Sequence, residues 1–354
     1  MDAVKRYRIA VIPGDGVGKE VIPAGQRVLE AAVAGHAELA WTVLPWGSDY
    51  YRQTGAMMPP DGLEILQDFD AIYLGAVGDP PRVPDHVTLW GLLLPIRKAF
   101  DLHVNVRPIK LLPGITGPLR DKGPEHIDMV FVRENTEGEY AGAGGRVHVG
   151  TPHEVALEIA VFSRFNVERV VRYAFELART RRKRLTSITK SNAQQHAMVF
   201  WDAVVAEVAR DYPDVEVTSL LVDAAAALMV RAPERFDVVV GSNLFADILT
   251  DLGGALMGSL GLPPSANLAY DPRFPSLFEP VHGSAPDIAG RGVANPIATI
   301  WAGAMMLDHL GETEAANRVM AAIEALTAEG KVLTPDLGGT ATTEQVAGRI
   351  IELL

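Results

Sequence analysis

The sequence predicts an α/β protein with a largely parallel sheet, because apolar segments of strand length alternate with segments of helical periodicity. Its 354 residues are enough for two domains. No repeat and no tether-like linker divides the chain, so a second domain is expected to be inserted into the first rather than appended to it. With 48% apolar and 21% charged residues, the chain is not intrinsically disordered.

The expected strands are short apolar runs, the first of which directly precedes a helical pattern. They span residues 7–12, 39–44, 69–74, 127–132, 185–189, 215–222 and 236–240. Helical spacing is clearest in residues 19–34, through Val21, Ile22, Val28 and Leu29. The other expected helices span residues 86–100, 154–182, 194–210, 296–310 and 315–328.

Composition excludes several classes of function. The formal net charge is -12, which disfavours a nucleic-acid partner. The basic run at residues 179–184 is interpreted as the end of a helix, where cations complement the dipole. The absence of cysteine excludes disulfides, zinc–thiolate sites and cysteine nucleophiles. No apolar run approaches the ~20 residues of a membrane span, and residues 1–6 show no signal-peptide pattern, so a cytoplasmic protein is expected.

A glycine-rich loop follows the first strand. Gly14, Gly16 and Gly18 are spaced GxGxG, whereas a Rossmann dinucleotide site has GxGxxG and an acidic residue ~20 positions later, at the end of a second strand. A Rossmann site is therefore rejected. The loop either approaches a ligand or forms a tight strand-to-helix turn, and the sequence leaves both open.

Charged residues near the ends of expected elements indicate a site for a small acid. Arg97, Arg107 and Arg133 are candidate guanidinium forks for carboxylates. Asp247 and Asp251 are four residues apart, which places both carboxylates on one helix face. Oxygen ligands of this kind suit Mg²⁺ or Mn²⁺, although helix charge alone could also explain the pair.

Three further residues are weaker candidates. Asp223 follows a strand and is either a helix N-cap or a third carboxylate of the same site. Lys190 closes a strand and could serve as a base, and Tyr140 follows a glycine- and glutamate-rich turn.

Taken together, five segments in order carry a resemblance. They are residues 12–18 (IPGDGVG), 105–108 (NVRP), 133–140 (RENTEGEY), 243–251 (NLFADILTD) and 279–287 (EPVHGSAPD). The chain resembles the metal-dependent decarboxylating β-hydroxyacid dehydrogenases, the isocitrate/isopropylmalate dehydrogenase family, over essentially its whole length. Within that family it is most similar to the branch that acts on tartrate and D-malate, through residues 83–91, 135–140, 144–147 and 172–178.

The resemblance implies an open two-domain α/β fold of the isopropylmalate dehydrogenase type, not a Rossmann fold. Residues 1–102 and 258–354 would form the cofactor-binding domain. Residues 103–257 would form the inserted domain, which binds substrate and metal and makes a homodimer. In the family a lysine and an aspartate reach across from the partner subunit, and Lys190 and Asp223 match those positions.

The resemblance also implies the chemistry. Arg97, Arg107 and Arg133 would bind the substrate carboxylates, and Mg²⁺ or Mn²⁺ would be held by Asp247, Asp251 and the partner's Asp223. Lys190 would take the hydroxyl proton during hydride transfer to NAD⁺, and Tyr140 would protonate the carbon from which CO₂ has left. D-malate would give pyruvate, CO₂ and NADH, and tartrate would be oxidised. Whether K⁺ is also needed, and whether dimers pair into tetramers, the sequence leaves open.

The cofactor residues implied by the resemblance lie in one loop and shortly after it. They are His282, Gly283, Ser284, Ala285, Asp287 and Asn295. The acidic Asp287 would bond the ribose hydroxyls and repel a 2′-phosphate, which favours NAD over NADP. The alternative activity is that of a 3-isopropylmalate dehydrogenase of leucine biosynthesis, and a non-catalytic regulatory subunit is the alternative outside enzymes. Leu93 and Leu94 fit either substrate, whereas the polar residues before Tyr140 favour a small hydroxylated acid.

Overall fold

A computed structural model describes residues 5–354 of the chain. Two compact units make up the protein, and the chain passes between them several times. Unit 1 comprises residues 1–102, 110–124 and 254–354, and unit 2 comprises residues 103–109 and 125–253. The sequence-based boundary assigned all of residues 103–257 to the inserted domain, whereas residues 110–124 and 254–257 fall in unit 1.

Unit 1 is built on strands in the order β2-β1-β3-β12-β11. The strands are β1 (Lys5–Gly14), β2 (Ala37–Val43), β3 (Ala71–Ala76), β11 (Pro264–Leu268) and β12 (Ser276–Pro280). The helices are α1 (Gly18–Val33), α2 (Ser48–Thr54), α3 (Gly62–Gln67), α4 (Asp85–Thr88), α5 (Leu94–Ala99), α10 (Ile297–His309), α11 (Thr313–Glu329) and α12 (Thr343–Leu353), with a π-helical segment at Leu89–Leu93. β1 is parallel to β2 and β3, β12 is parallel to β3, and only β11 among these pairs antiparallel to its neighbour.

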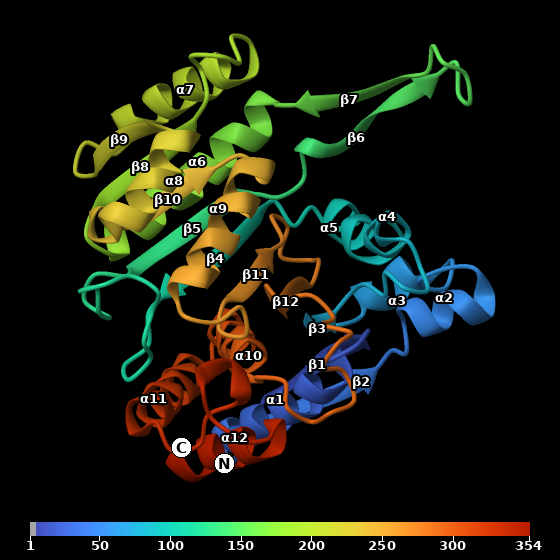
Figure 1. Ribbon diagram of the computed structural model, residues 1–354, viewed down its shortest axis with the longest axis vertical. Helices are drawn as coiled ribbons and strands as arrows, with labels where there is room; N and C mark the ends of the chain where they lie inside the picture. Colours follow the sequence, from blue (N-terminus) through green and yellow to red (C-terminus); the bar gives the residue numbers. More distant parts are fainter. Residues whose placement is uncertain (1–4) are drawn as a thin grey trace. The chain divides into compact units, whose positions relative to one another are not determined.

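The middle of the unit 1 sheet is buried on both faces. Every residue of β3 is buried, which is typical of a parallel strand covered by helices on both sides. α1, α10, α11 and α12 pack against one another on one side, as Figure 1 shows. On the other side Leu74, Leu92 and Phe100 belong to an apolar cluster that joins the sheet to the segment around α5. This packing fixes the carboxyl ends of β1 and β3, where the glycine-rich loop lies.

Unit 2 has its own strand order, β4-β5-β10-β8-β9. The strands are β4 (Val104–Lys110), β5 (Asp128–Glu134), β8 (Arg184–Thr189), β9 (Glu216–Leu221) and β10 (Val238–Gly241). The helices are α6 (Arg164–Thr180), α7 (Ala197–Val208), α8 (Val222–Arg231) and α9 (Asn243–Leu256). β10 is parallel to β5 and β8, and β8 is parallel to β9, so the carboxyl ends of β5 and β10 lie side by side. α9 begins two residues after β10, at the same edge.

A long hairpin leaves unit 2 at the end of β5. It consists of β6 (Gly138–Val147) and β7 (Val155–Val161), which pair only with each other, and is the green arm in Figure 1. Most of its residues are exposed. We call the hairpin of β6 and β7 the arm.

The arm corrects one sequence-based prediction. Residues 154–182 were expected to form one helix, but Val155–Val161 is a strand and the helix begins only at Arg164. The residues of β7 alternate large apolar and small or polar side chains, which is the period of a strand. The Ser163 side chain accepts a hydrogen bond from the Asn166 backbone N–H and so caps the new helix.

The basic run at residues 179–184 lies at the end of α6, as expected, but its role goes beyond the helix dipole. Asp237, which is fully buried, accepts hydrogen bonds from the Arg181 guanidinium (2.8 Å) and the Arg182 backbone N–H (2.9 Å). The Arg182 side chain donates to the carbonyl of Phe236. These cations are therefore counter-ions and donors within the fold. In the described part of the chain, no helix is long and apolar enough to cross a membrane.

Candidate active site

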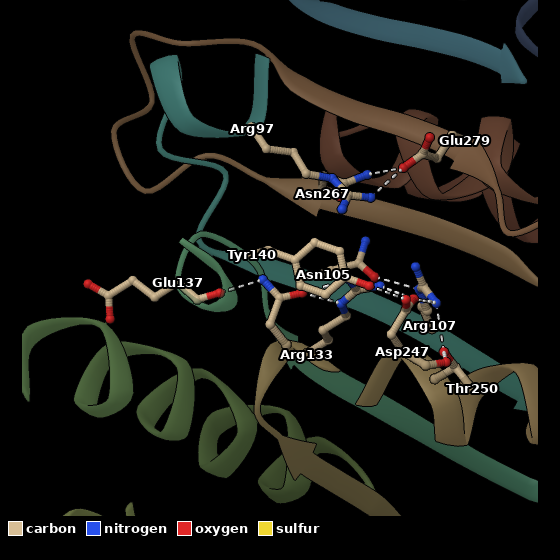
Figure 2. A network of polar contacts seen from close by, with 11 residues as sticks. Arg97, Asn105, Arg107, Arg133, Glu137, Tyr140, Asp247, Thr250, Asn267 and Glu279 are labelled. Atoms are coloured by element: carbon tan, nitrogen blue, oxygen red, sulfur yellow. Dashed lines mark hydrogen bonds and ion pairs between the residues drawn. The ribbon is translucent and has the colours of Figure 1, made fainter. Parts of the chain in front are cut away.

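Polar side chains of unit 2 converge where β4, β5, β6 and α9 meet. We call this group the arginine–aspartate cluster: Asn105, Arg107, Arg133, Tyr140, Asn243, Asp247 and Thr250, of which Figure 2 labels all but Asn243. β4 and β5 deliver the two arginines, β6 delivers the tyrosine, and α9 delivers the aspartate. Arg107 and Arg133 are only 5% and 2% exposed. Cations so deeply buried need counter-charges and hydrogen-bond acceptors nearby.

Arg107 is held by three neighbours. Its Nε donates to Asn105 Oδ1 at 2.6 Å, and its Nη1 donates to Thr250 Oγ1 at 2.7 Å and to Asp247 Oδ1 at 3.1 Å. Asn105 and Arg107 are two residues apart on β4, so both side chains lie on the same face of the strand. The strand geometry therefore pre-orients the guanidinium.

Arg133 is held in a similar way by residues of α9. Its Nε and Nη2 donate to Asn243 Oδ1 at 2.9 and 2.6 Å, and its Nη1 forms a short ion pair with Asp247 Oδ1. The Arg133 guanidinium also lies 5.3 Å from the centroid of the Tyr140 ring. The two arginines therefore share one carboxylate oxygen, Asp247 Oδ1, and their guanidinium groups lie next to each other around it.

Tyr140 completes the cluster from the base of the arm. Its hydroxyl donates to Asp247 Oδ2 at 2.9 Å. The carboxylate of Asp247 therefore accepts hydrogen bonds from Tyr140 on Oδ2 and from both arginines on Oδ1. Guanidinium forks beside a phenolic O–H form a suitable receptor for a small carboxylic acid with a further oxygen function. Sequence analysis selected Arg107, Arg133, Tyr140 and Asp247, and unit 2 brings these four together.

Asp247 and Asp251 lie one turn apart on α9, as the spacing predicted. Burial and the neighbouring Asp247 raise the pKa of Asp251, while Arg107 and Arg133 oppose that shift. Two carboxylates that repel each other, with oxygen donors only, fit Mg²⁺ or Mn²⁺, which would remove the repulsion. Within residues 5–354 of a single chain, no three His, Cys, Asp or Glu side chains are grouped so that they could hold a metal. On their own, these two aspartates would supply only part of a ligand set, and their role as metal ligands stays a prediction.

Lys190 and Asp223 form a pair of their own in unit 2. Lys190 Nζ donates to Asp223 Oδ1 at 2.8 Å, and this hydrogen bond lowers the pKa of Asp223. Lys190 directly follows β8, and Asp223 is the second residue of α8. Leu221 occupies the N-cap position, so Asp223 is not the N-cap that the sequence left open. The ends of β8 and β9 thus place Lys190 and Asp223 side by side.

Arg97 belongs to unit 1, on the last turn of α5. Its Nη2 donates to Glu279 Oε1 at 3.0 Å, and Asn267 Nδ2 donates to the same oxygen at 2.9 Å (Figure 2). Arg97 is 4% exposed, and its buried Nε has no hydrogen-bond partner. Glu279 balances the charge of Arg97 one to one, whereas the two arginines of unit 2 share the single carboxylate of Asp247.

Unit 1 contains a cavity of about 580 Å³ beside the glycine-rich loop. This is within the range of about 300–1,000 Å³ typical of small-molecule sites. Its walls are mainly apolar, with a few polar groups among them. The lining residues are Val17, Ser259, Leu260, Gly261, His282, Ala285, Ile288, Val293, Ala294, Asn295, Pro335 and Asp336.

Two hydrogen-bond acceptors face this cavity. Burial lowers the pKa of His282, so its imidazole is neutral at pH 7. Its Nδ1 donates to the Gly283 carbonyl at 2.9 Å, which leaves Nε2 as an acceptor, and this buried atom has no partner. Asp336 Oδ2 accepts from Asn295 Nδ2 at 3.0 Å and from the Ser259 hydroxyl.

The expected cofactor residues divide into two groups. His282, Ala285 and Asn295 line the cavity, whereas Gly283, Ser284 and Asp287 do not. Sequence analysis missed Asp336, which lies far along the chain in a short 3-10 helix (Pro335–Leu337) without a motif. Its contacts with Asn295 and Ser259 place it at the cavity wall.

The glycine-rich loop forms a tight turn against residues 282–287, the loop expected to bind the cofactor, which we call the cofactor loop. A Cβ on Gly16, where φ is +52°, would lie 1.9 Å from the Ser284 carbonyl oxygen, so only glycine fits there. The next residue, Val17, donates its N–H to that oxygen at 2.9 Å and lines the cavity. The loop forms a tight turn and its Val17 lines the cavity, so its approach to a ligand stays a prediction.

Comparison with known proteins fits this arrangement. The family model described as isocitrate/isopropylmalate dehydrogenase matches residues 8–350. The chain belongs to this family. A D-malate dehydrogenase [decarboxylating] from Escherichia coli K12 is 55% identical over 360 residues, covering 99% of both chains. A tartrate dehydrogenase/decarboxylase from Pseudomonas putida is 50% identical and covers 98% of both.

Solved structures agree with the family assignment. The isocitrate dehydrogenase of Methylococcus capsulatus has a TM-score of 0.89 and 37% sequence identity, covering 98% of this chain and 99% of that one. The family's α/β fold, expected from the sequence, is therefore confirmed.

Proposed function

We propose that the protein catalyses the NAD-dependent oxidative decarboxylation of D-malate to pyruvate and CO₂, and the oxidation of tartrate, with Mg²⁺ or Mn²⁺. The observation that carries this proposal is the arginine–aspartate cluster of unit 2, in which Arg107, Arg133, Tyr140 and Asp247 meet. The similarity to relatives named for D-malate and tartrate supports this substrate class over 3-isopropylmalate.

Substrate binding is assigned to the arginines. Arg107 and Arg133 bind the carboxylates of the acid through charge-assisted hydrogen bonds, each worth about 1.5–3 kcal/mol. Arg97 is proposed as the third member of the receptor. Because Glu279 balances its charge, Arg97 contributes directional N–H donors more than net charge. The polar segment before Tyr140 favours a hydroxylated acid over one with a branched alkyl group.

Asp247 and Asp251, with the partner's Asp223, would hold the divalent ion. When bound, the metal would polarise the C2 hydroxyl oxygen and so favour oxidation of carbon C2 to a ketone. The raised pKa of Asp251 supports this assignment, because a carboxylate that ionises reluctantly on its own gains most from a nearby cation.

The proton steps are assigned to Lys190 and Tyr140. Lys190 accepts the proton of the substrate hydroxyl as the C2 hydride moves to NAD⁺, and Asp223 holds its amine in place. The carboxyl group β to the new ketone leaves as CO₂, and Tyr140 donates its phenolic proton to the carbon that is left. The products are pyruvate, CO₂ and NADH, which balances the hydride, the carbon and the protons.

NAD is assigned to the cavity of unit 1. The unpartnered His282 Nε2 and the Asp336 carboxylate are both acceptors, and an adenine amino group supplies two N–H donors. The apolar walls suit the faces of a purine ring. Asp287, in the loop next to the cavity, would bond the ribose hydroxyls and repel a 2′-phosphate, so NAD is preferred over NADP.

A homodimer is also part of this proposal, and the arm supports it. Val147, Val155, Leu157 and Ile159 are all exposed, and the register Val147↔Val155 places them on one face of the hairpin. A two-stranded hairpin is marginally stable by itself in water, and an exposed apolar face marks an interaction site. A second copy of the chain is the proposed cover, and Lys190 and Asp223 are proposed to serve the partner's active site. The cytoplasm is the proposed compartment.

A substrate panel tests the proposal. NADH formation is measured with Mn²⁺ on D-malate, L-tartrate, meso-tartrate, isocitrate and 3-isopropylmalate, each with NAD⁺ and with NADP⁺. We expect the highest kcat/KM with D-malate and NAD⁺, measurable turnover of tartrate, and poor use of 3-isopropylmalate. A higher kcat/KM for 3-isopropylmalate than for D-malate would overturn the substrate assignment, and a preference for NADP⁺ would overturn the cofactor assignment.

A further inference from the structure

Asn243 is a buried member of the arginine–aspartate cluster that has no role in the chemistry above. It is the first residue of α9 and is 1% exposed. Asn243, Asp247 and Asp251 follow one another at intervals of four residues, so they share one face of the helix. Asn243 thus lies one turn before the aspartate that both arginines contact.

The carboxamide of Asn243 joins two segments of the site. Its Oδ1 accepts from both Nε and Nη2 of Arg133, at 2.9 and 2.6 Å. Its Nδ2 donates to the carbonyl oxygen of Glu137 at 3.0 Å. One side chain on α9 therefore fixes the guanidinium at the end of β5 and also the turn that leads into β6 and Tyr140.

The turn is fixed from its other end by Glu134. This buried carboxylate accepts from the backbone N–H and the hydroxyl of Thr136, both at 2.8 Å, and from the Glu137 N–H. Gly138 follows with φ of +67°, and a Cβ there would lie 3.1 Å from the Cβ of Asn243. The turn is thus packed directly on Asn243, and a displacement of this side chain would be transmitted to β6.

An amide is chemically distinct from the carboxylate that holds the arginine of unit 1. Glu279 neutralises Arg97, whereas the neutral Asn243 satisfies two N–H groups of Arg133 without adding to the negative charge of Asp247, which Arg133 shares with Arg107. Asn105 does the same for Arg107 through its Nε. An amide offers both an acceptor for the guanidinium and an N–H donor for the Glu137 carbonyl without adding charge.

We propose that Asn243 is a positioning residue that sets the orientation and effective charge of Arg133 and holds the segment carrying Tyr140, so that substrate binding and carbon protonation share one anchor. This inference rests on the proposed function and deepens it. Asn243 acts through Arg133, so its removal should weaken binding of the acid substrate. Binding of NAD⁺ should not change, because its proposed cavity lies in unit 1.

The test is a double-mutant cycle with Asn243→Ala and Arg133→Gln. Asn243→Ala should raise KM for D-malate by about 10–100-fold, since it removes acceptors of charge-assisted hydrogen bonds worth about 1.5–3 kcal/mol each. KM for NAD⁺ should stay within about twofold. In the Arg133→Gln background, the same change should raise KM by less than about threefold, because the group on which Asn243 acts is gone.

Two further variants complete the test. Asn243→Asp keeps the shape but adds a charge against Arg133 and removes the donor to Glu137, so it should impair D-malate binding at least as much as Asn243→Ala. Asn166→Ala, which removes another buried carboxamide of unit 2 whose side-chain oxygen has no partner, is the control and should leave KM unchanged. Thermal unfolding of each variant identifies those that fail to fold, and Asn243→Ser then replaces Asn243→Ala.

D-malate binding is also measured by calorimetry without NAD⁺, which separates this inference from the proposed function. Wild-type protein that binds D-malate but does not turn it over would refute the proposed reaction, while a loss of binding in Asn243→Ala would still support the anchor. The inference about Asn243 would be overturned if Asn243→Ala had equal effects with and without Arg133, or if it raised KM for NAD⁺ as much as KM for D-malate. No binding of D-malate by the wild-type protein would overturn both.

Discussion

Asp247→Asn should destabilise unit 2, because Asp247 is the counter-ion of two buried arginines as well as an expected metal ligand. The side chains of Arg107 and Arg133 are 7% and 2% exposed, and both donate to Asp247 Oδ1. Breaking a fully buried pair costs about 3–5 kcal/mol, but the Asp247 side chain is 32% exposed, which reduces the cost. The asparagine oxygen would still accept from one guanidinium, so we expect the lower end, about 3 kcal/mol. At about 2–4 °C per kcal/mol, Tm should fall by roughly 6–12 °C.

Asp251→Asn is the matched control, one turn further along α9. Burial and Asp247 raise the pKa of Asp251, which means that its charged form is disfavoured in the folded protein. Removing that charge should therefore leave Tm of the metal-free protein unchanged or slightly higher at pH 7. The two substitutions are chemically identical, so a difference between them reports only the surroundings of each carboxylate.

The assay is thermal unfolding in EDTA, followed by addition of Mn²⁺. A ligand at 100 times its Kd stabilises the fold by about 2.7 kcal/mol, so Tm of the wild-type protein should rise by roughly 5–11 °C. Both variants should lose most of this increase. If Asp247→Asn is as stable as Asp251→Asn in EDTA, the counter-ion argument is wrong. If Asp251→Asn responds to Mn²⁺ like the wild-type protein, Asp251 is not a ligand.

The remaining predictions concern pH, the dimer and the cofactor. Mn²⁺ affinity should fall as the pH drops through the raised pKa of Asp251, because the ion requires the ionised carboxylate; calorimetric titration from pH 7 downwards should show a weaker fall in Asp251→Asn, and an unaltered profile would contradict the assignment. Leu157→Asp, on the exposed apolar face of the arm, should convert a dimer to monomers in sedimentation velocity, and a dimer of unchanged affinity would exclude the arm from the interface. Glu20→Ala should raise KM for NAD⁺ several-fold at unchanged KM for D-malate, because Glu20 accepts the Gly292 N–H at 2.8 Å beside the cofactor loop; the opposite split in steady-state kinetics would refute this role.

Sequence alone was sufficient where chemistry and spacing are local. The interval between Asp247 and Asp251 placed both on one helix, and α9 carries them. Arg133 was selected because it closes an apolar strand before a glycine-rich turn, and it lies at the end of β5. Such features depend on a few neighbouring residues, whose backbone geometry the sequence largely determines.

Partners that are distant in sequence were not predictable. No local pattern indicates that Glu279 neutralises Arg97, which is 182 residues away, or that Asn243 holds Arg133, which is 110 away. Asp336 reaches the cavity only through tertiary packing. The strand β7 is a different case, because its two-residue alternation and the capping Ser163 are both visible in the sequence. The predicted helix was wrongly extended from α6 back to residue 154.

The most direct test of the account is the stoichiometry of the reaction with D-malate. Purified protein is incubated with D-malate, NAD⁺ and Mn²⁺, and NADH, CO₂ and pyruvate are measured in the same sample. Oxidative decarboxylation predicts the three products in equal amounts, with no product in EDTA. NADH formed without CO₂, so that oxaloacetate accumulates, or no NADH from D-malate at all, would contradict the proposed function.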